Sequence, residues 1–375
     1  MGEVLLVLAG DVMTGRGVDQ VMVSPVPPRL EEEHVKDART YVELAERVNG
    51  TIPSPVGAEW IWGDALDVMR RAGPSVRVMN LETSVTWSEE RAPGKGIHYR
   101  MSPDNVACLR VAGVDVWALA NNHVLDHGVP GLLETVDTLH ESGLRVCGAG
   151  ADRSAAWTPA VVDHPAGRVR VLSVAHGSSG VPAGWAAGGS RPGVALLPDL
   201  GDRTAEDVAE RLAGAAAPGD VLVVSVHWGS NWGFRVPAEQ VRFAHRLVDS
   251  GVDVIHGHSS HHPRPVEVYH DRPVLYGCGD LVDDYEGIRG CEGFRDDLRL
   301  LHMVRLDAEG RLLTLTAVPF QARRLRLWLA GREDTDWLVD TLAEPCQGFG
   351  TTVGRQLDGT LAFARDGTSR GDPAR

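Results

Sequence analysis

Residues 252–262 read Val-Asp-Val-Ile-His-Gly-His-Ser-Ser-His-His, a short apolar run that ends in a cluster of histidines. Short runs rich in Val and Ile are typical of strands buried on both faces of a sheet. Histidine is the commonest neutral metal ligand in proteins. Taken alone, the cluster could equally be a surface loop, so its meaning depends on the rest of the chain.

The same kind of apolar run recurs along the chain, at residues 4–9, 76–79, 114–120, 169–174, 221–226 and 274–276. Helical patterns lie between several of these runs, at residues 130–142, 204–217 and 237–250. This alternation predicts an α/β fold in which helices cover buried sheets. We expect one domain over residues 1–330 with an inserted loop and helix at 24–60, then an extension packed on it at 331–365 and a disordered tail at 366–375.

Polar side chains follow six of the runs at the point where each run ends. A lone Asp in such a place is usually a helix N-cap, and a lone Asn-His is usually a turn. The carboxyl ends of parallel strands meet at one edge of a sheet, however, so these residues can share a site. Their types are the ligands of a divalent metal, and the set is Asp11, Asn80, Glu82, Asn121, Asn122, His123, His227, His256, His258, His261, His262 and Asp280.

Composition excludes several classes of protein. The 375 residues include 37 Lys and Arg against 51 Asp and Glu, a net charge of -14, which argues against nucleic-acid binding. The N-terminal run lacks a basic region, and no apolar stretch approaches the ~20 residues of a membrane helix. The five cysteines form no CxxC pair. We therefore expect a cytoplasmic protein with no membrane or nucleic-acid partner, and the sequence leaves its oligomeric state open.

The ordered motifs resemble one family. Gly-Asp-Val-Met at 10–13, Asn-Leu-Glu at 80–82, Asn-Asn-His-x-Leu-Asp-x-Gly at 121–128, His-Trp-Gly at 227–229 and Gly-His-x-x-His at 257–261 are similar to those of the poly-gamma-glutamate capsule biosynthesis (CapA-type) family. That family is a branch of the calcineurin-like metallophosphoesterase superfamily. The resemblance runs over residues 4–322 and implies a four-layer α/β/β/α sandwich that binds one or two divalent metal ions (Mn, Fe or Zn).

The resemblance also implies roles for individual residues. Asp11 would bind the first metal and take part in catalysis, and Glu82 would bridge the two ions. Asn122, His227 and His258 would bind the second metal, His261 would return to the first, and His123 would protonate the leaving group or steady the transition state. Two cations close together lower the pKa of a bridging water, and an imidazole can supply the proton.

The chain departs from the superfamily pattern in ways that bear on the metals. Met13 stands where the superfamily usually has a His ligand, and the bridging residue lies in Asn80-Leu81-Glu82 rather than in Gly-Asp. Two residues, Ser259 and Ser260, separate histidines that usually have one residue between them. The first two departures, which the CapA-type branch shares, indicate a weakened first metal site and leave mononuclear chemistry open. Asp280 replaces a common Asn, and we expect it to orient a His rather than to serve as an added ligand. We expect Asn80 and His262 to orient ligands too.

Three residues are candidates for binding substrate. Arg100 and Arg16 could hold a phosphate or carboxylate, and Trp228 could wall the pocket. The alternatives are a surface ion pair for Arg100 and core packing for Trp228.

The sequence supports three functions. The first is metal-dependent cleavage of a phosphate ester with a metal-activated water. The second is metal-dependent action on amide or gamma-glutamyl bonds in a biosynthetic pathway, so that the substrate is a small molecule or a gamma-glutamyl compound. The third is a non-catalytic component of poly-gamma-glutamate synthesis or export, which is less favoured because no N-terminal anchor is expected from the sequence.

Overall fold

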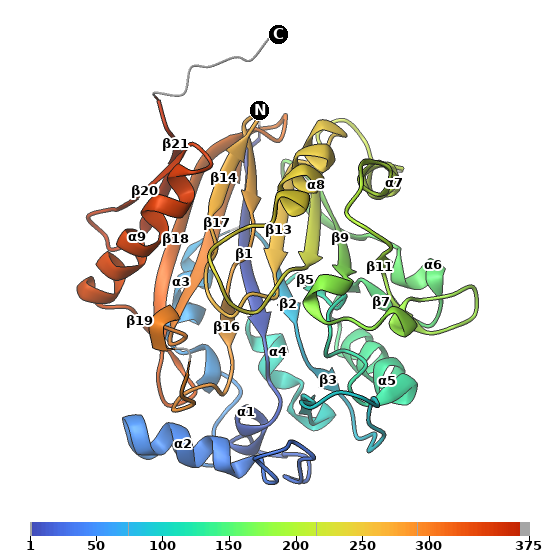
Figure 1. The fold of residues 1–375 in the computed structure, drawn as a ribbon, viewed down its shortest axis with the longest axis vertical. Coiled ribbons are helices and arrows are strands. Elements are labelled where there is room, and N and C mark those ends of the chain that lie inside the picture. Colours follow the sequence, from blue (N-terminus) through green and yellow to red (C-terminus); the bar gives the residue numbers. More distant parts are fainter. Residues whose placement is uncertain (1, 74, 215, 291, 368–375) are drawn as a thin grey trace.

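The computed structural model of the chain describes residues 2–73, 75–214, 216–290 and 292–367 (Figure 1). Two mixed β-sheets form its centre. The first has the strand order β20 (Thr351–Arg355), β21 (Leu361–Arg365), β18 (Leu312–Ala322), β17 (Leu298–Leu306), β1 (Val4–Val12), β2 (Val76–Leu81), β5 (Val116–Ala118) and β6 (Val146–Cys147), with β16 (Asp280–Val282) paired to β1 and β19 (Leu327–Leu329) paired to β18.

The second sheet is smaller and also contains both parallel and antiparallel pairs of strands. Its order is β11 (Leu196–Leu197), β9 (Gly167–His176), β12 (Val221–His227), β13 (Val254–His258), β15 (Arg272–Leu275) and β14 (Val266–Tyr269), with β8 (Ala160–His164) paired to β9. Two short pairs stand apart, β3 (Ser84–Val85) with β4 (Arg100–Met101) and β7 (Ala149–Gly150) with β10 (Gly193–Val194).

The alternation of side chains along β1 shows how the layers are built. Leu6 and Leu8 belong to an apolar cluster that also contains Val171 and Val223 of the second sheet, so this cluster fills the space between the sheets. Val7 and Ala9, which point the other way, pack with side chains of the helices outside the first sheet. Each sheet therefore buries both faces, which explains the nearly continuous apolar runs in the sequence.

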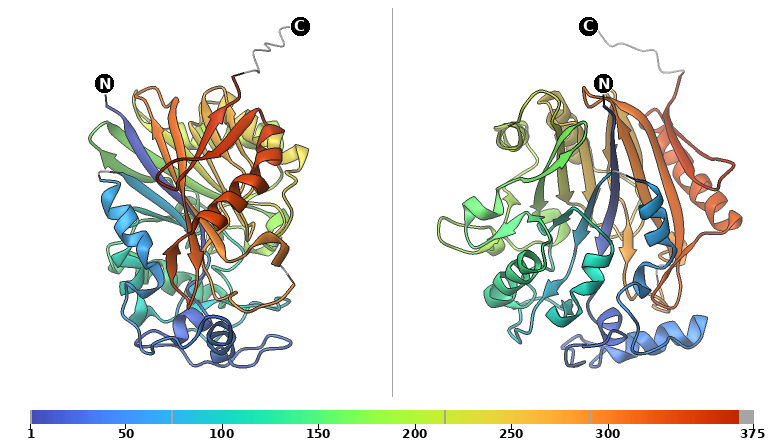
Figure 2. Two further views of the ribbon diagram at one scale, coloured as in Figure 1. Left: turned by 90° about the vertical axis from the view of Figure 1, so that its left-hand side faces the viewer. Right: turned by 180° about the vertical axis from the view of Figure 1, so that it is seen from behind.

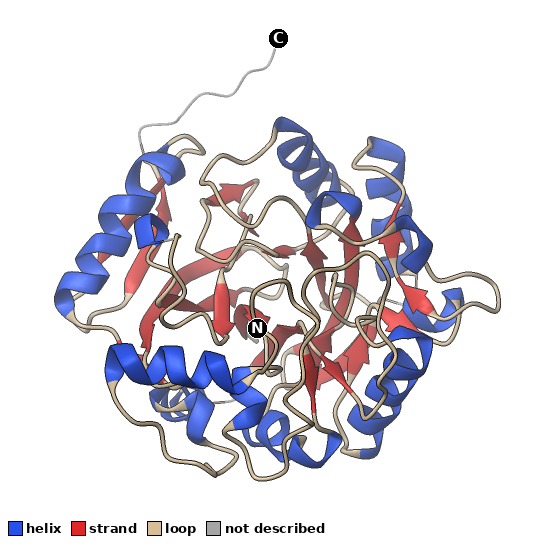
Figure 3. Cartoon of the chain, turned by 60° about the horizontal axis from the view of Figure 1, so that its bottom comes forward, coloured by secondary structure: helices blue, strands red, loops and turns tan. Residues whose placement is uncertain are grey.

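Helices cover the outer face of each sheet. The first sheet is covered by α3 (Asp64–Arg71), α4 (Ala107–Val111) and α5 (Gly128–Glu141), and the second by α7 (Asp202–Ala213) and α8 (Ala238–Asp249). Figure 3 shows helices at the periphery and strands inside. The predicted α/β/β/α sandwich is confirmed. The other short helices are α6 (Arg153–Ala156) and the 3₁₀ turns η1 (Trp60–Trp62), η2 (Pro103–Asn105), η3 (Gly177–Ser179), η4 (Ala183–Trp185) and η5 (Glu292–Phe294).

The C-terminal extension contributes to the sandwich itself. Strand β21 pairs with β18, and α9 (Arg332–Gln347) places Leu338 and Leu342 in the cluster between the sheets. Figure 2 shows α9 running along the first sheet. Of the predicted tail, Asp366 donates its N–H to the Gly350 carbonyl at 2.8 Å, and residues 368–375 lie outside the described residues.

The parallel strands bring the polar ends of the runs to one side of the molecule. β1 is parallel to β2 and β16, and β12 is parallel to β13. Figure 1 shows α1 (Gly17–Gln20) and α2 (Arg39–Asn49) below the carboxyl end of β1. Within the described part of the chain, no helix has the length and apolar character needed to cross a bilayer.

Candidate metal centre

Asp11 belongs to two groups of buried side chains that could each hold a metal ion. One group is Asp11, His227 and His258, and the other is Asp11, His261 and Asp280; within each, the ligand atoms lie within 4.8 Å of one another. Strand register explains the grouping, because Asp11 on β1 lies opposite Asp280 on β16 and His227 on β12 lies opposite His258 on β13. The two sheets thus each contribute a neighbouring pair.

The first group is held together by short contacts between rings. His227 Nδ1 lies 2.8 Å from His258 Nδ1, which is 3.6 Å from Asp11 Oδ1. The Ser225 hydroxyl lies 2.9 Å from His258 Nε2, so it fixes that ring with Nδ1 facing the carboxylate. Asn122 Oδ1 lies 3.0 Å from His227 Nε2. The structure therefore brings together the three residues expected at a second metal.

Glu82 lies on the His227 side of this centre. Its Oε1 is 3.8 Å from His227 Nε2 and 3.7 Å from His123 Nε2. Asn80 stands between the two carboxylates, donating its Nδ2–H to Asp11 Oδ1 at 2.7 Å and approaching Glu82 Oε2 at 3.4 Å. Asp11 is the carboxylate common to both groups, and a bridging role for Glu82 stays a prediction.

The second group depends on Asp280. Its Oδ1 lies 2.9 Å from His261 Nδ1, a contact that sets the orientation of the ring. Its Oδ2 is buried and accepts no hydrogen bond from an N–H or hydroxyl group of the described residues, while the side chain of Asp283 interacts with its carboxyl group. Asp280 can therefore orient His261 through one oxygen and offer the other to an ion.

A strained residue supports Asp11 from the loop after β13. Ser259 has a φ of 97°, a left-handed conformation that is uncommon for residues other than glycine, and its N–H donates to Asp11 Oδ2 at 3.0 Å. With Asn80 on Oδ1 and Ser259 on Oδ2, both oxygens of Asp11 are held in place. Such positioning is what a metal-binding carboxylate requires.

The charges of the cluster fit a cation. Burial, together with the neighbouring Asp280, raises the pKa of Asp11 to about 7, and burial raises the pKa of Asp280 to about 7. Burial and Asp11 raise the pKa of Glu82 well above its ordinary value. Burial lowers the pKa values of His227 and His258, which keeps both rings neutral. Neutral imidazoles beside buried carboxylates are a donor set that suits a divalent metal ion, whose charge would restore ionisation of the acids.

His123 lies next to this donor set and is positioned by an acid that the sequence analysis did not single out. Its Nδ1 is 2.6 Å from Asp126 Oδ2, so this nitrogen carries the proton and Nε2 faces Glu82. The Tyr99 ring packs edge-on against the imidazole, with centroids 4.6 Å apart. Burial lowers the pKa of His123 to about 4. The sequence signal that could have identified Asp126 is its position three residues after His123, within the motif at 121–128.

Lys95 is a second residue that the sequence analysis missed. Its ammonium lies 2.5 Å from Asp126 Oδ1 and 3.3 Å from His123 Nδ1, and it also donates to the backbone carbonyl of Asn122. Burial opposes ionisation of Asp126, but His123 and Lys95 outweigh it and lower the pKa of that carboxyl. Lys95 comes from an irregular segment with no periodic pattern, so no local signal indicated its place.

A large cleft of about 1020 Å³ opens beside His261. One wall is formed by the insertion at 24–60, through Glu32, Val35, Tyr41, Leu44, Arg47 and Val48. The lining also includes Ile97, Trp232, Tyr285 and Ile288. Tyr285 Oη lies 3.5 Å from His261 Nε2 and Asn231 Nδ2 lies 3.0 Å from it. The predicted insertion therefore borders the cleft that leads to the candidate metal centre.

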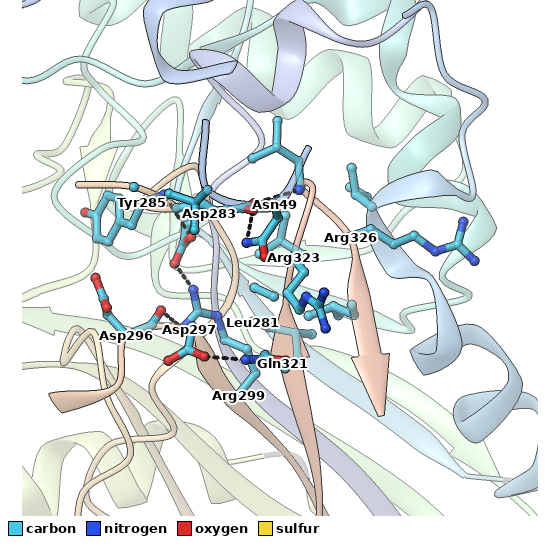
Figure 4. Close-up of a pocket in the computed structure, with 18 of the residues that line it drawn as sticks. Asn49, Leu281, Asp283, Tyr285, Asp296, Asp297, Arg299, Gln321, Arg323 and Arg326 are labelled. Carbon is cyan, nitrogen blue, oxygen red and sulfur yellow. Dashed lines mark hydrogen bonds and ion pairs between the residues drawn. The ribbon is translucent and has the colours of Figure 1, made fainter. Parts of the chain in front are cut away.

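A smaller pocket of about 230 Å³, shown in Figure 4, is lined by Leu281, Val282 and Asp283, the residues that follow Asp280. Arg299 is fully buried at its edge and forms an ion pair of 2.5 Å with Asp283. Burial raises the pKa of Asp280, and the Arg299 guanidinium partly offsets this effect. Arg299 thus supports the ionised form of Asp280.

Of the substrate-binding candidates, the structure places Arg16 in the lining of the cleft and Trp228 in the core. Trp228 is fully buried against Phe243 and donates its indole N–H to the Tyr276 carbonyl at 3.0 Å, which is the core packing that the sequence left open. A side chain there cannot contact a substrate. Arg16 lines the cleft but is engaged by Asp284 and by Glu32, the latter at 3.1 Å.

Arg100 and His262 belong to neither of the two groups of candidate metal ligands. Arg100 donates to the Ser88 carbonyl at 2.8 Å in a separate small cavity. His262 stacks on Trp232, and its Nε2 accepts the Gly233 N–H at 3.0 Å. Its Nδ1 contacts the Pro263 carbonyl at 3.0 Å, so its hydrogen bonds are to backbone groups of the neighbouring loops.

Fold and centre together define an α/β/β/α protein with a candidate metal centre at its strand ends. Residues 5–285 match the family described as bacterial capsule synthesis protein PGA_cap, and the chain belongs to this family. The resemblance inferred from the motifs is therefore confirmed.

Individual relatives agree with this assignment. A probable polyglutamine synthesis accessory protein of Mycobacterium tuberculosis is 50% identical over 362 residues, covering 96% of this chain and 95% of the relative. The PGA biosynthesis protein CapA of Bacillus subtilis is 29% identical over 235 residues, covering 62% of this chain and 58% of that protein.

Among solved structures, a 5'-nucleotidase precursor from Thermus thermophilus superposes with a TM-score of 0.47 and 16% identity, covering 92% of this chain and 59% of that one. A similarity at that level does not transfer an activity.

Proposed function

We propose that this protein is a metal-dependent hydrolase that acts in polyglutamate synthesis. The observation that carries the proposal is that Asp11 is common to two groups of buried nitrogen and oxygen ligands beside a large cleft. One or two divalent ions there would polarise a substrate oxygen and lower the pKa of water. The PGA_cap family and the names of the relatives support the biosynthetic setting.

The protein's own residues have separate tasks in this proposal. Asp11, His227 and His258 would hold one ion, and His261 with Asp280 would complete a second group around Asp11. Asp126 keeps the proton of His123 on Nδ1, so that Nε2 faces the centre and can exchange a proton with the reacting group. Tyr285 and Trp232 shape the side of the cleft nearest His261.

Two kinds of bond are candidates for cleavage. Paired ligand groups that share a carboxylate suit phosphate esters, because two cations can stabilise both the attacking and the leaving oxygen. Two-metal centres also hydrolyse amides. A gamma-glutamyl amide is supported by the name of the Bacillus subtilis relative, a PGA biosynthesis protein.

The test combines metal analysis with a substrate panel. Purified protein loaded with Mn²⁺ or Zn²⁺ would be assayed on phosphate esters and on gamma-glutamyl amides, with Asp11→Ala and His123→Ala as controls. We expect turnover of one class, lost in both variants, with metal retained in His123→Ala. Protein that takes up no metal, or that binds gamma-glutamyl compounds without cleaving them, would overturn the hydrolase and favour a non-catalytic component of polyglutamate synthesis.

A further inference from the structure

A small cavity next to the cleft is lined by an unusual number of cationic and hydrogen-bond-donating side chains. It has a volume of about 20 Å³, and Arg16 and Glu32 line both it and the cleft. We call it the Arg100 pocket, after the residue that is least compensated in it. Its other cationic and imidazole side chains are Arg29, Arg91, His98 and His127.

Arg100 is a buried guanidinium without a close acidic partner. Only 8% of the residue is exposed, and its side chain makes a single hydrogen bond among the described residues, to the Ser88 carbonyl. Within 4.0 Å no carboxylate of the described residues reaches it, and Glu89 and Asp19 act on it only from farther away. The remaining N–H groups of this guanidinium make no hydrogen bond to the described residues and are therefore free to bind an anion that enters the pocket.

His127 faces the same cavity with no partner of its own. The residue is 2% exposed, and neither ring nitrogen forms a hydrogen bond within the described part of the chain. Native proteins rarely leave a buried polar side chain unsatisfied unless a water, ion or ligand group completes it. The ring of His98 lies beside it, with centroids 6.1 Å apart.

The acids around the pocket are already committed. Glu31 pairs at 2.9 Å with both Arg29 and Arg91, and Glu32 pairs with Arg16 at 3.1 Å. Arg16 is further neutralised by Asp284. Glu31 therefore pairs with both Arg29 and Arg91. Arg100 and His127 have no such acid beside them and can bind an anion from outside the protein.

The size of the pocket indicates which anion it takes. A water molecule needs roughly 10–15 Å³ of such space, so about 20 Å³ admits a group of about one water's size, such as a carboxylate oxygen, but not a whole metabolite. A planar carboxylate also matches the fork of a guanidinium. The remainder of such a ligand would lie in the adjoining cleft, whose lining shares Arg16 and Glu32 with the pocket.

We propose that the Arg100 pocket binds a terminal carboxylate of the substrate, held by Arg100 and His127, while the rest of the substrate lies in the cleft beside His261. This assignment deepens the proposed function, on which it rests, by naming a carboxylate-bearing substrate class. Because the pocket and the metal centre are built from different residues, carboxylate binding and metal binding can be measured separately.

The experiment uses calorimetric titration of the full-length, metal-free protein with gamma-glutamylglutamate, and in a separate arm with inorganic phosphate. We expect the dipeptide to bind, and Arg100→Gln and His127→Asn each to weaken it about 10- to 100-fold, the range for losing a hydrogen bond to a charged group. Arg100→Lys, which keeps the charge but loses the fork, should also bind more weakly than the wild type.

Arg39→Gln is the matched control, because Arg39 is largely exposed, pairs with Asp37, and lines neither the Arg100 pocket nor the cleft. It should bind the dipeptide as the wild type does, and all the variants should bind Mn²⁺ normally. The proposal is overturned if the dipeptide does not bind at 10 mM, or if Arg100→Gln and Arg100→Lys bind it unchanged. Binding of phosphate but not of the dipeptide would overturn the carboxylate assignment. If the wild-type protein binds the dipeptide but takes up no Mn²⁺, the result contradicts the metal centre and leaves the Arg100 pocket supported.

Discussion

Asp126 holds the Nδ1 of His123 at 2.6 Å from its Oδ2, and this contact decides which nitrogen of the imidazole faces the candidate metal centre. With the proton kept on Nδ1, Nε2 points toward Glu82, 3.7 Å away. The two residues are only three positions apart in sequence. Their contact nevertheless fixes which nitrogen of His123 faces Glu82, a residue that follows a different strand.

Replacing Asp126 by Asn should therefore reduce turnover without removing the metal. An amide can present its N–H to Nδ1, which favours the wrong tautomer and lowers the rate by about 10²- to 10⁴-fold, the range for general acid–base catalysis. The measurement is kcat on the best substrate of the panel, with metal content determined in parallel. Because the two residues act as a unit, the double variant with His123→Ala should be no slower than His123→Ala alone. Additive losses would contradict the dyad.

Asp11→Asn should abolish metal binding at both groups, because Asp11 is common to them. The measurement is the metal-to-protein ratio by elemental analysis after dialysis against Mn²⁺. Asp253→Asn is the matched control, since Asp253 is also a buried aspartate at a strand and accepts the Leu222 N–H at 2.8 Å, away from the cluster. Equal metal content in the two variants would contradict the assignment of Asp11.

Protons and metal ions should compete at this centre. The pKa of Asp280 is raised to about 7, above its unfolded value of about 3.9, so the metal-free native state holds the extra proton. The sign follows from linkage: this contribution to stability is fully present below the unfolded pKa and is lost as the pH rises through about 7. Mn²⁺ affinity should change the opposite way and fall as the pH is lowered from 8 to 6.

Asp280→Asn isolates that effect. Thermal melts of metal-free wild type and variant at pH 5.5 and pH 8 should show a smaller pH dependence in Asp280→Asn, because one of the acids with a raised pKa is gone. If the melting temperatures of the wild type and the variant change by the same amount between the two pH values, Asp280 does not titrate in this range.

The two tryptophans near the His227 motif should respond differently to truncation. Trp228 is fully buried against Phe243, so Trp228→Ala should lower the free energy of unfolding by about 3–5 kcal/mol. Trp232 lines the cleft, with its ring 5.5 Å from that of His261, so Trp232→Ala should chiefly raise KM. Denaturant melts and steady-state kinetics on both variants check this. A larger loss of stability in Trp232→Ala would reverse the assignment.

Much of the fold was predictable because strands buried on both faces leave an unbroken apolar signature. The runs at 4–9 and 221–226 became β1 (Val4–Val12) and β12 (Val221–His227), each extended to include the polar residue at its end. The C-terminal strands were harder to foresee. In β20 (Thr351–Arg355) only Thr351 is buried, so its pattern carries almost no apolar signal, and its place follows from pairing with β21.

The candidate centre was predictable where a ligand follows its own strand and unpredictable where a partner comes from afar. Arg16 lies in a glycine-containing turn that suggests anion binding, but Asp284, 268 residues away, pairs with it instead. Lys95 and Tyr285 reach the centre from irregular segments with no period to read. Such contacts depend on how loops meet in three dimensions, which neither local propensity nor spacing records.

The position of β1 has a consequence for how the chain is made. β1 lies between β2 and β17, and β17 begins at Leu298 although β1 ends at Val12. At roughly 5–20 residues per second, synthesis leaves one edge of this apolar strand without its neighbour for roughly 15–60 s. The nascent chain therefore exposes an unpaired edge of an apolar strand that later lies in the middle of the sheet. Delayed pairing of this kind makes folding slow and makes the unfinished protein a natural client of chaperones.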